Sequence, residues 1–389
     1  MLHGNSLKFL IVFFVLGLAC LFIPLSASSD EGTAIFDACS HQTAYHRKAG
    51  CYQKKIEALM KKQGTEQALD ALSLLAGEDP DILQRAHQYA YFLGWRSFFH
   101  YEDASVAFSH CRDTFSSGCY HGVLQGHLGS LSKVDALTAA AVCDEQIEAA
   151  RHSMFLRYQC VHGLGHGLTV HFQYDLKKAL SVCDGLAMEW DRDSCYGGVF
   201  MENVVASQNI HHQQQYSGQA AKRKSVLRPR DPLYPCNSVA TKYQHACYQM
   251  QASAILTLTQ HNFSQAFHIC SKAPAAFTST CYESLGRNIS GLTLRNEQKI
   301  VSLCGKGQPT ATAWCLVGAV KDIITAHADP QRGLAFCRHL NVPTQKEGCY
   351  AAAGQVLATL YPDEQRRERA CAVAEEQYVS VCRSAAPKL

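Results

Sequence analysis

Cysteines recur at a fixed interval along much of this chain. In the C-terminal part they occupy Cys247, Cys281, Cys315, Cys349 and Cys382, so that successive members are 34, 34, 34 and 33 residues apart. A period that is kept over several steps is typical of a repeat array, and about 34 residues is the length of one helix–turn–helix unit. The spacing therefore predicts an all-α protein that is built as a right-handed α-solenoid.

Each of these cysteines has a partner a short distance before it in the chain. Seven of the nine neighbour pairs have ten or eleven residues between them, one has seven and one has sixteen. A loop of this size suits a bond from the end of one unit's second helix to the start of the next unit's first helix. Closing such a loop contributes about 2–3 kcal/mol in the chain-entropy account of disulfide stability. The predicted bonds are Cys39–Cys51, Cys111–Cys119, Cys143–Cys160, Cys183–Cys195, Cys236–Cys247, Cys270–Cys281, Cys304–Cys315, Cys337–Cys349 and Cys371–Cys382.

One unit can be read directly from its side chains. Residues 310–327 favour a helix, and their apolar members, such as Trp314 and Val320, are spaced for a single face. Asp329-Pro330 ends this helix and begins the next one, because proline is favoured in the first turn of a helix. Residues 331–340 then form a shorter second helix.

The helix ends of this chain resemble those of a known repeat family. Second-helix ends such as 179–184, with Cys183, and first-helix openings such as 348–354, with Cys349, are similar to those of disulfide-stapled Sel1-like repeats, which belong with the TPR-like arrays. The resemblance covers most of residues 34–385 and implies an α-solenoid. The chain departs from the family in its longer cysteine spacing and in lacking a glycine-rich turn within each unit.

The N-terminus has the pattern of an export signal. Lys8 precedes an apolar run over residues 9–25, and the small residues Ser26 to Ser29 follow it. The run is long for a signal core and short for a membrane span, so cleavage near Ala27 or Ser28 and an uncleaved anchor both stay open. Without Cys20, which lies in this run, 18 of the 19 cysteines remain. An even number suits a disulfide framework in an exported protein, periplasmic or secreted.

The period also divides the chain into regions. Residues 1–28 form the signal or anchor, residues 34–205 the first repeats, and residues 236–385 the most regular repeats. Between them the cysteine period is interrupted by an insertion at 206–235, whose polar, basic and proline-bearing sequence predicts a solvated surface loop or a dock for an acidic partner. The net charge of +3 gives no reason to expect nucleic acid as a partner, and a membrane enters only through an uncleaved N-terminus.

Three central units carry histidines and acidic or amide residues near their cysteines. His162 and His166 are four residues apart, and so lie on one face of a helix. His121 stands two residues after Cys119, as His162 does after Cys160, while Glu202 follows Cys195 in the next unit. Since equivalent positions of stacked units are neighbours, His121, His162, His166 and Glu202 are expected to converge. Imidazoles in this arrangement can bind a metal ion, which would be zinc or copper, with Met188 and Met201 keeping copper open.

A structural interpretation of these residues stays open as well. Glycines crowd the same helix openings, and glycine within a helix needs a reason such as close helix approach. The histidines would then fill the gaps beside these glycines. His127 lies six residues after His121 and should point elsewhere. The crowded glycines are Gly122, Gly163, Gly165, Gly167, Gly197 and Gly198.

Two functions follow from these observations. The first is a scaffold that binds a protein or peptide on its concave face, as extended repeat arrays commonly do. The second is a metal-binding protein or enzyme that uses the histidines. The chain has no His-Glu-x-x-His, no Gly-x-Ser-x-Gly and no phosphate-binding glycine loop. We therefore expect binding rather than catalysis.

Overall fold

The computed structural model describes residues 25–149, 154–207, 226–326, 328–361 and 363–385. These residues are mostly helical and include no strand, so the predicted all-α class is confirmed. Most of the predicted signal lies outside the described residues. The first described helix, α1 (Leu25–Cys39), runs through the expected cleavage point near Ala27 and Ser28.

Long and short helices alternate along the chain, as the repeat predicts. The long first helices of the units are α2 (Tyr45–Gln63), α4 (Pro80–Tyr101), α6 (Thr114–Ser130), α8 (Met154–His171), α10 (Glu189–Ser207), α11 (Thr241–Leu258), α13 (Ala275–Leu292), α15 (Pro309–Thr325) and α17 (Pro343–Leu360). The second helices are α1, α3 (Thr65–Glu78), α5 (Ala104–Ser109), α7 (Ala136–Ala149), α9 (Leu176–Asp184), α12 (Phe263–Cys270), α14 (Glu297–Cys304), α16 (Pro330–His339) and α18 (Glu364–Cys371). The 3₁₀ turn η2 (Glu376–Tyr378) and helix α19 (Val379–Ser384) end the described chain.

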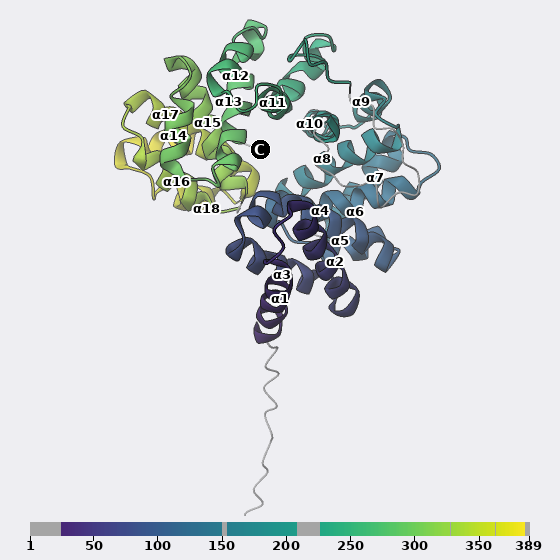
Figure 1. Cartoon of the computed structure of the whole chain (residues 1–389). Coiled ribbons are helices and arrows are strands. Elements are labelled where there is room, and N and C mark those ends of the chain that lie inside the picture. Colours follow the sequence, from purple (N-terminus) through teal and green to yellow (C-terminus); the bar gives the residue numbers. More distant parts are fainter. Residues whose placement is uncertain (1–24, 150–153, 208–225, 327, 362, 386–389) are drawn as a thin grey trace, which may run out of the picture.

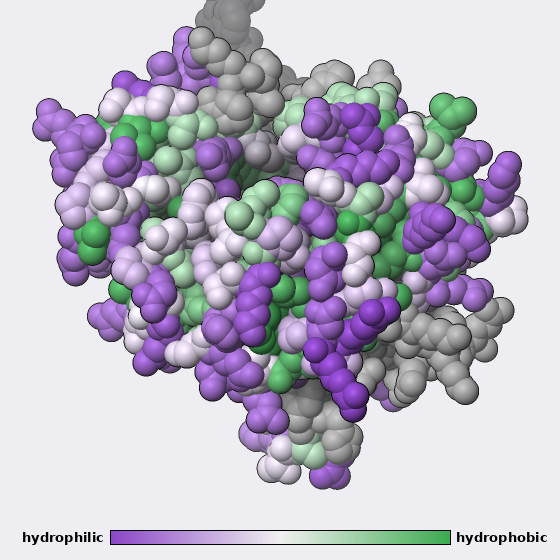
Figure 2. All heavy atoms as spheres, turned by 90° about the horizontal axis from the view of Figure 1, so that it is seen from above, coloured by the Kyte–Doolittle hydropathy of each residue, from purple (hydrophilic) through white to green (hydrophobic). Residues whose placement is uncertain are grey.

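The long helices form one continuous layer. Each of them packs on the next, from α2 through α17 to α19, while the short helices lie against the outside of this layer. The array bends through a wide arc, with α1 and α3 at the bottom of the view, α12 at the top and α16 and α17 on the left (Figure 1). Helix α17 contacts α8, so the C-terminal part of the array returns to its middle. Seen from above, small groups of hydrophobic residues are scattered between hydrophilic ones (Figure 2).

The turn between the two helices of a unit takes left-handed backbone angles at residues that are not glycine. Before α12, Gln260 and His261 take left-handed backbone angles, with φ of 51° and 60°, and Leu294 and Arg295 do the same before α14. A side-chain cap then starts six of the short helices by accepting a hydrogen bond from a backbone N–H in the first turn. These caps are Asp103, Asp175, Asn262, Asn296, Asp329 and Asp363.

All nine predicted cysteine pairs lie within bonding distance. Their sulfur atoms are 1.90 to 2.10 Å apart, and their Cα atoms are 5.3 to 5.7 Å apart. These separations are those of disulfide bonds. Nine such bonds are consistent with an oxidising compartment. Within the described ranges, no helix combines the length and the hydropathy that crossing a membrane requires.

The insertion between the two groups of repeats is only partly described. Residues 208–225, which include most of its basic run, lie outside the described residues. Its last part packs closely rather than forming a free loop. The Val226 N–H donates to the Asn203 side chain at 3.1 Å, and the Gln251 amide donates to the carbonyls of Pro232 and Tyr234 at 2.8 and 3.0 Å. This end of the insertion is therefore fixed to α10 and α11.

Candidate functional site

Close approach of helix backbones creates the central part of the array. A Cβ atom at Gly165 on α8 would lie 2.2 Å from the Cys195 carbonyl oxygen, and one at Gly198 on α10 would lie 1.9 Å from the His162 carbonyl oxygen. Both distances are far inside van der Waals contact, so only glycine fits at either position. The sequence-based reason for these glycines, close helix approach, is the one that the structure has. It brings the side chains on the same faces of α8 and α10 together.

Three histidines meet where α6 and α8 pack. The ring centroids of His121 and His162 are 5.4 Å apart, those of His121 and His166 are 5.4 Å apart, and those of His162 and His166 are 5.1 Å apart. All three side chains are almost fully buried, with 2–3% of their surface exposed. We call these three residues the histidine cluster.

Glycines beside the rings make room for this cluster. A Cβ atom at Gly163 would lie 3.0 Å from Cδ2 of His121, and one at Gly197 would lie 3.3 Å from Nδ1 of His162. The rings therefore occupy the space that larger residues would fill. The histidines thus fill the gaps beside the glycines, which is the structural interpretation of these residues given above. The contacts of the ring nitrogens are a separate question.

Glu202 on α10 orients one ring of the cluster. Its Oε2 lies 3.0 Å from Nδ1 of His166, and its Oε1 accepts a hydrogen bond from the Tyr174 hydroxyl at 2.9 Å. The carboxylate is completely buried, so these two contacts take up both of its oxygens in a dry environment. In the neutral tautomer of His166 that donates its Nδ1–H to this carboxylate, Nε2 carries the lone pair.

The other two rings each have one contacted nitrogen. Nε2 of His121 lies 3.1 Å from Oε1 of Gln159, which makes it the donor and leaves Nδ1 with a lone pair. Nε2 of His162 lies 3.2 Å from the sulfur of Met201. A thioether is a weak acceptor, so this contact does not decide which nitrogen of His162 carries the proton.

Several polar atoms in the cluster have no hydrogen-bond partner among the described residues. Nδ1 of His121, Nδ1 of His162 and Nε2 of His166 are such atoms, and so is Oε1 of Gln125 on α6. Buried polar atoms are nearly always paired, and an unpaired one points to an additional water molecule or ion. Each of the three rings of the cluster therefore has one buried nitrogen without a partner among the described residues.

Burial favours the neutral form of His87, His121 and His162. It is the main cause that lowers the pKa of His121 and His162 well below its usual range, and the charges that neighbouring groups would carry lower it further. For His162 these neighbours are His166 and Arg287, while a weak interaction with the Ser194 backbone acts in the opposite direction. Burial also lowers the pKa of His87 to about 4. Neutral imidazole is the form that binds metal ions.

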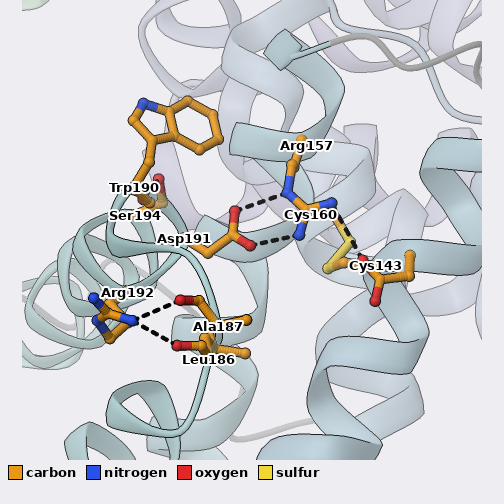
Figure 3. Close-up of polar contacts among 10 residues, drawn as sticks. Cys143, Arg157, Cys160, Leu186, Ala187, Trp190, Asp191, Arg192 and Ser194 are labelled. Carbon is orange, nitrogen blue, oxygen red and sulfur yellow. Dashed lines mark hydrogen bonds and ion pairs between the residues drawn. A yellow bond between two sulfur atoms is a disulfide. The ribbon is translucent and has the colours of Figure 1, made fainter. Parts of the chain in front are cut away.

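An ion pair beside the cluster holds α8 and α10 in register. The guanidinium of Arg157 makes two hydrogen bonds to Asp191, one of them from Nε at 2.8 Å, and a third bond at 3.2 Å to Asp144 (Figure 3). Asp191 is 3% exposed, so this pair is strongly shielded from water. The disulfide between Cys143 and Cys160 lies next to it.

The structure brings together the four residues expected from the sequence, and it adds others. His87 on α4 lies edge-on to His121, with centroids 5.6 Å apart, and its Nδ1 lies 2.8 Å from the Phe115 carbonyl. No spacing rule points to it, because it does not share the position of His121 or His162 in its unit. His127 lies against the ring of Phe98, away from the cluster, as expected.

The cluster as it stands is not arranged as a metal centre. In the part of the chain that the structure describes, no three His, Cys, Asp or Glu side chains are placed to hold one metal ion. The predicted zinc-type set of His121, His162, His166 and Glu202 is thus assembled but does not converge on one point. Glu202 in particular is directed at His166 and Tyr174.

An open depression lies elsewhere, between α1 and α2. It has a volume of about 210 Å³, and its wall includes Ile35, Leu59 and Lys62.

Comparison of the chain with protein-family models, with curated proteins and with solved structures finds no match.

Proposed function

We propose that this chain is an exported, right-handed helical-repeat protein that binds a metal ion at the histidine cluster. One observation carries the proposal, namely the four buried polar atoms without partners, three of which are imidazole nitrogens. The predicted signal sequence and the nine disulfides support export. Two further observations support metal binding, namely the orientation of the histidine rings and the distances between them.

The orientation is that of metal-binding histidines. Such residues usually donate their second ring N–H to a carboxylate, a carbonyl or water, which fixes the tautomer and leaves the first nitrogen free to coordinate. His166 has this relation with Glu202, and His121 has it with the amide oxygen of Gln159. The partners of the rings are thus already in place.

The distances between the ring centroids suit three rings that bind the same ion. Zinc lies about 2.1 Å from a histidine nitrogen, hence about 3.2 Å from the ring centroid, and two such centroids at a tetrahedral angle are about 5.2 Å apart. The three centroid distances of the cluster are 5.1 to 5.4 Å. The rings therefore already lie at the separation that one shared ion would require.

Binding fits this environment better than catalysis does. A catalytic metal needs an open position for its substrate and a general base near it. The cluster is buried, and both oxygens of Glu202 are already occupied. The proposed activity is therefore to hold an ion and not to turn over a substrate.

Elemental analysis of the protein exported into an oxidising compartment tests the proposal. The double variant His162→Ala/His166→Ala removes two of the three rings of the cluster, while His268→Ala, at an exposed position on α12, is the matched control. We expect one transition-metal ion per chain in the wild type and the control, and none in the double variant. Circular dichroism of the double variant checks that it is folded. A wild-type protein that retains no metal after exposure to zinc and copper would overturn the proposal.

A second candidate is the scaffold function, in which a protein or peptide binds along the array. One observation favours it. Leu258 and Leu292 end α11 and α13 at equivalent positions, and with Leu294 they are 38–39% exposed. They form a short apolar row on consecutive units. Cross-linking in the native compartment, with Leu258→Glu/Leu292→Glu as the variant, tests it. A cross-linked partner that the variant retains would contradict a role for this row.

A further inference from the structure

Met201 on α10 places a thioether sulfur beside one ring of the histidine cluster. It stands six residues after Cys195, which is the position that His166 has in its own unit after Cys160. Its sulfur lies 3.2 Å from Nε2 of His162. Met201 is half-buried, whereas His162 is 3% exposed, so this side of the cluster is the one nearer to solvent.

The distance between these two atoms suits shared coordination. A metal ion with about 2.0 Å to an imidazole nitrogen and about 2.3 Å to a sulfur, at an angle slightly above 90°, places the two ligand atoms about 3.2 Å apart. The tautomer that this requires has its proton on Nδ1 of His162, the ring atom that lies beside Gly197.

A second thioether, that of Met250, lies near Gly197, as the same ring does. The methyl group of Met250 on α11 is 3.4 Å from the place where a Cβ of Gly197 would be, and Nδ1 of His162 is 3.3 Å from that place. Met250 is 2% exposed, and its sulfur accepts a hydrogen bond from Arg287 at 3.0 Å. It therefore makes the surroundings of His162 soft and polarizable without being free to coordinate.

We infer that the ion held by this site is monovalent copper, coordinated by Nε2 of His162, by the sulfur of Met201 and by Nε2 of His166. The inference rests on the proposed function and names its metal. Neutral thioether and imidazole ligands select Cu(I), whereas zinc and the harder divalent ions prefer thiolates, imidazoles and carboxylates. His166 supplies the third ligand because its unpartnered nitrogen belongs to the nearest ring, 5.1 Å from that of His162 between centroids. The ion enters as Cu(I), and no electron is transferred on binding.

An anaerobic titration of the intact protein with Cu(I), in competition with a chromophoric Cu(I) chelator, tests this assignment. Met201→Leu keeps the volume of the side chain and removes the sulfur, so we expect it to fold normally. Met188→Leu is the control, since Met188 is 42% exposed in the loop before α10. We expect one Cu(I) per chain in the wild type and the control, and an affinity at least ten-fold weaker for Met201→Leu.

The outcomes separate the copper assignment from the proposed function. Equal Cu(I) affinity of Met201→Leu and the wild type would overturn the assignment. Stoichiometric zinc without Cu(I) would also overturn it, while leaving the proposed metal site in place. Binding of neither ion would remove both.

Discussion

Close backbone contact between neighbouring long helices makes a sharp prediction at Gly286. A Cβ at this position would lie 1.8 Å from the carbonyl oxygen of Cys315, and the reciprocal Gly318 would meet the Glu283 carbonyl at the same distance. Carbon and oxygen atoms that are not bonded need about 3.2 Å, so Gly286→Ala must push α13 and α15 apart by more than 1 Å, which costs several kcal/mol in overpacking and lost contacts.

The expected loss for Gly286→Ala is about 3–4 kcal/mol in the free energy of unfolding, after an allowance of about 1 kcal/mol for the better helix propensity of alanine. Gly291→Ala is the matched control on the same helix, because a Cβ there would meet nothing within 4 Å. The control should be neutral or slightly more stable than the wild type, by up to about 1 kcal/mol.

Urea unfolding followed by circular dichroism, with the disulfides intact, measures both variants. The account requires a large downward shift of the midpoint for Gly286→Ala and none for Gly291→Ala. Equal midpoints for the two variants would refute the claim that glycine is needed for helix approach. A normal midpoint for both would mean that α13 and α15 are farther apart than the structure has them.

Three other perturbations have defined outcomes. Acidification from pH 7.5 to 5 should lower the urea midpoint. The pKa of His87 is lowered to about 4, so between that value and pH 6.5 the unfolded chain binds more protons at this residue than the folded protein does. In this window the free energy of unfolding falls by up to about 1.4 kcal/mol for each unit by which the pH is lowered. An unchanged midpoint would contradict this. Reduction should weaken the array unit by unit, since each bond closes a short loop worth about 3 kcal/mol; one sharp thermal transition indifferent to reductant would count against it. Asp191→Asn breaks the shielded ion pair with Arg157 and should lower the free energy of unfolding by about 3 kcal/mol. Asp144→Asn removes a partner whose side chain is 60% exposed, so in the same urea assay it should cost less than about 1 kcal/mol. Similar losses for the two variants would argue against the pairing of Arg157 with Asp191.

The cysteine period predicted the disulfide pairs because it is a local property. Each pair lies within one connection between consecutive helices, so chain distance alone brings its members together. The unit read from residues 310–340 corresponds in the same way to α15 and α16, apart from His327, which lies outside the described residues. The handedness of the superhelix is not a local property, and the predicted right-handed solenoid stays a prediction.

The histidine cluster was predictable only in part. Equivalent positions in stacked units place His121 beside His162, and helix periodicity adds His166. The contacts of Met201 and His87 depend on how far each helix is rotated about its own axis, which repeat spacing does not specify. The contact between α17 and α8 depends on the curvature summed over many units, so no short stretch of sequence encodes it.

The most direct test of the account is an X-ray absorption spectrum at the edge of the metal that the exported protein carries. The account predicts scattering from at least two imidazole rings, with one sulfur neighbour if the ion is copper. Loss of the imidazole signal in His162→Ala/His166→Ala would agree with it. A spectrum of water or carboxylate oxygens alone would contradict the claim that the buried histidines bind the ion.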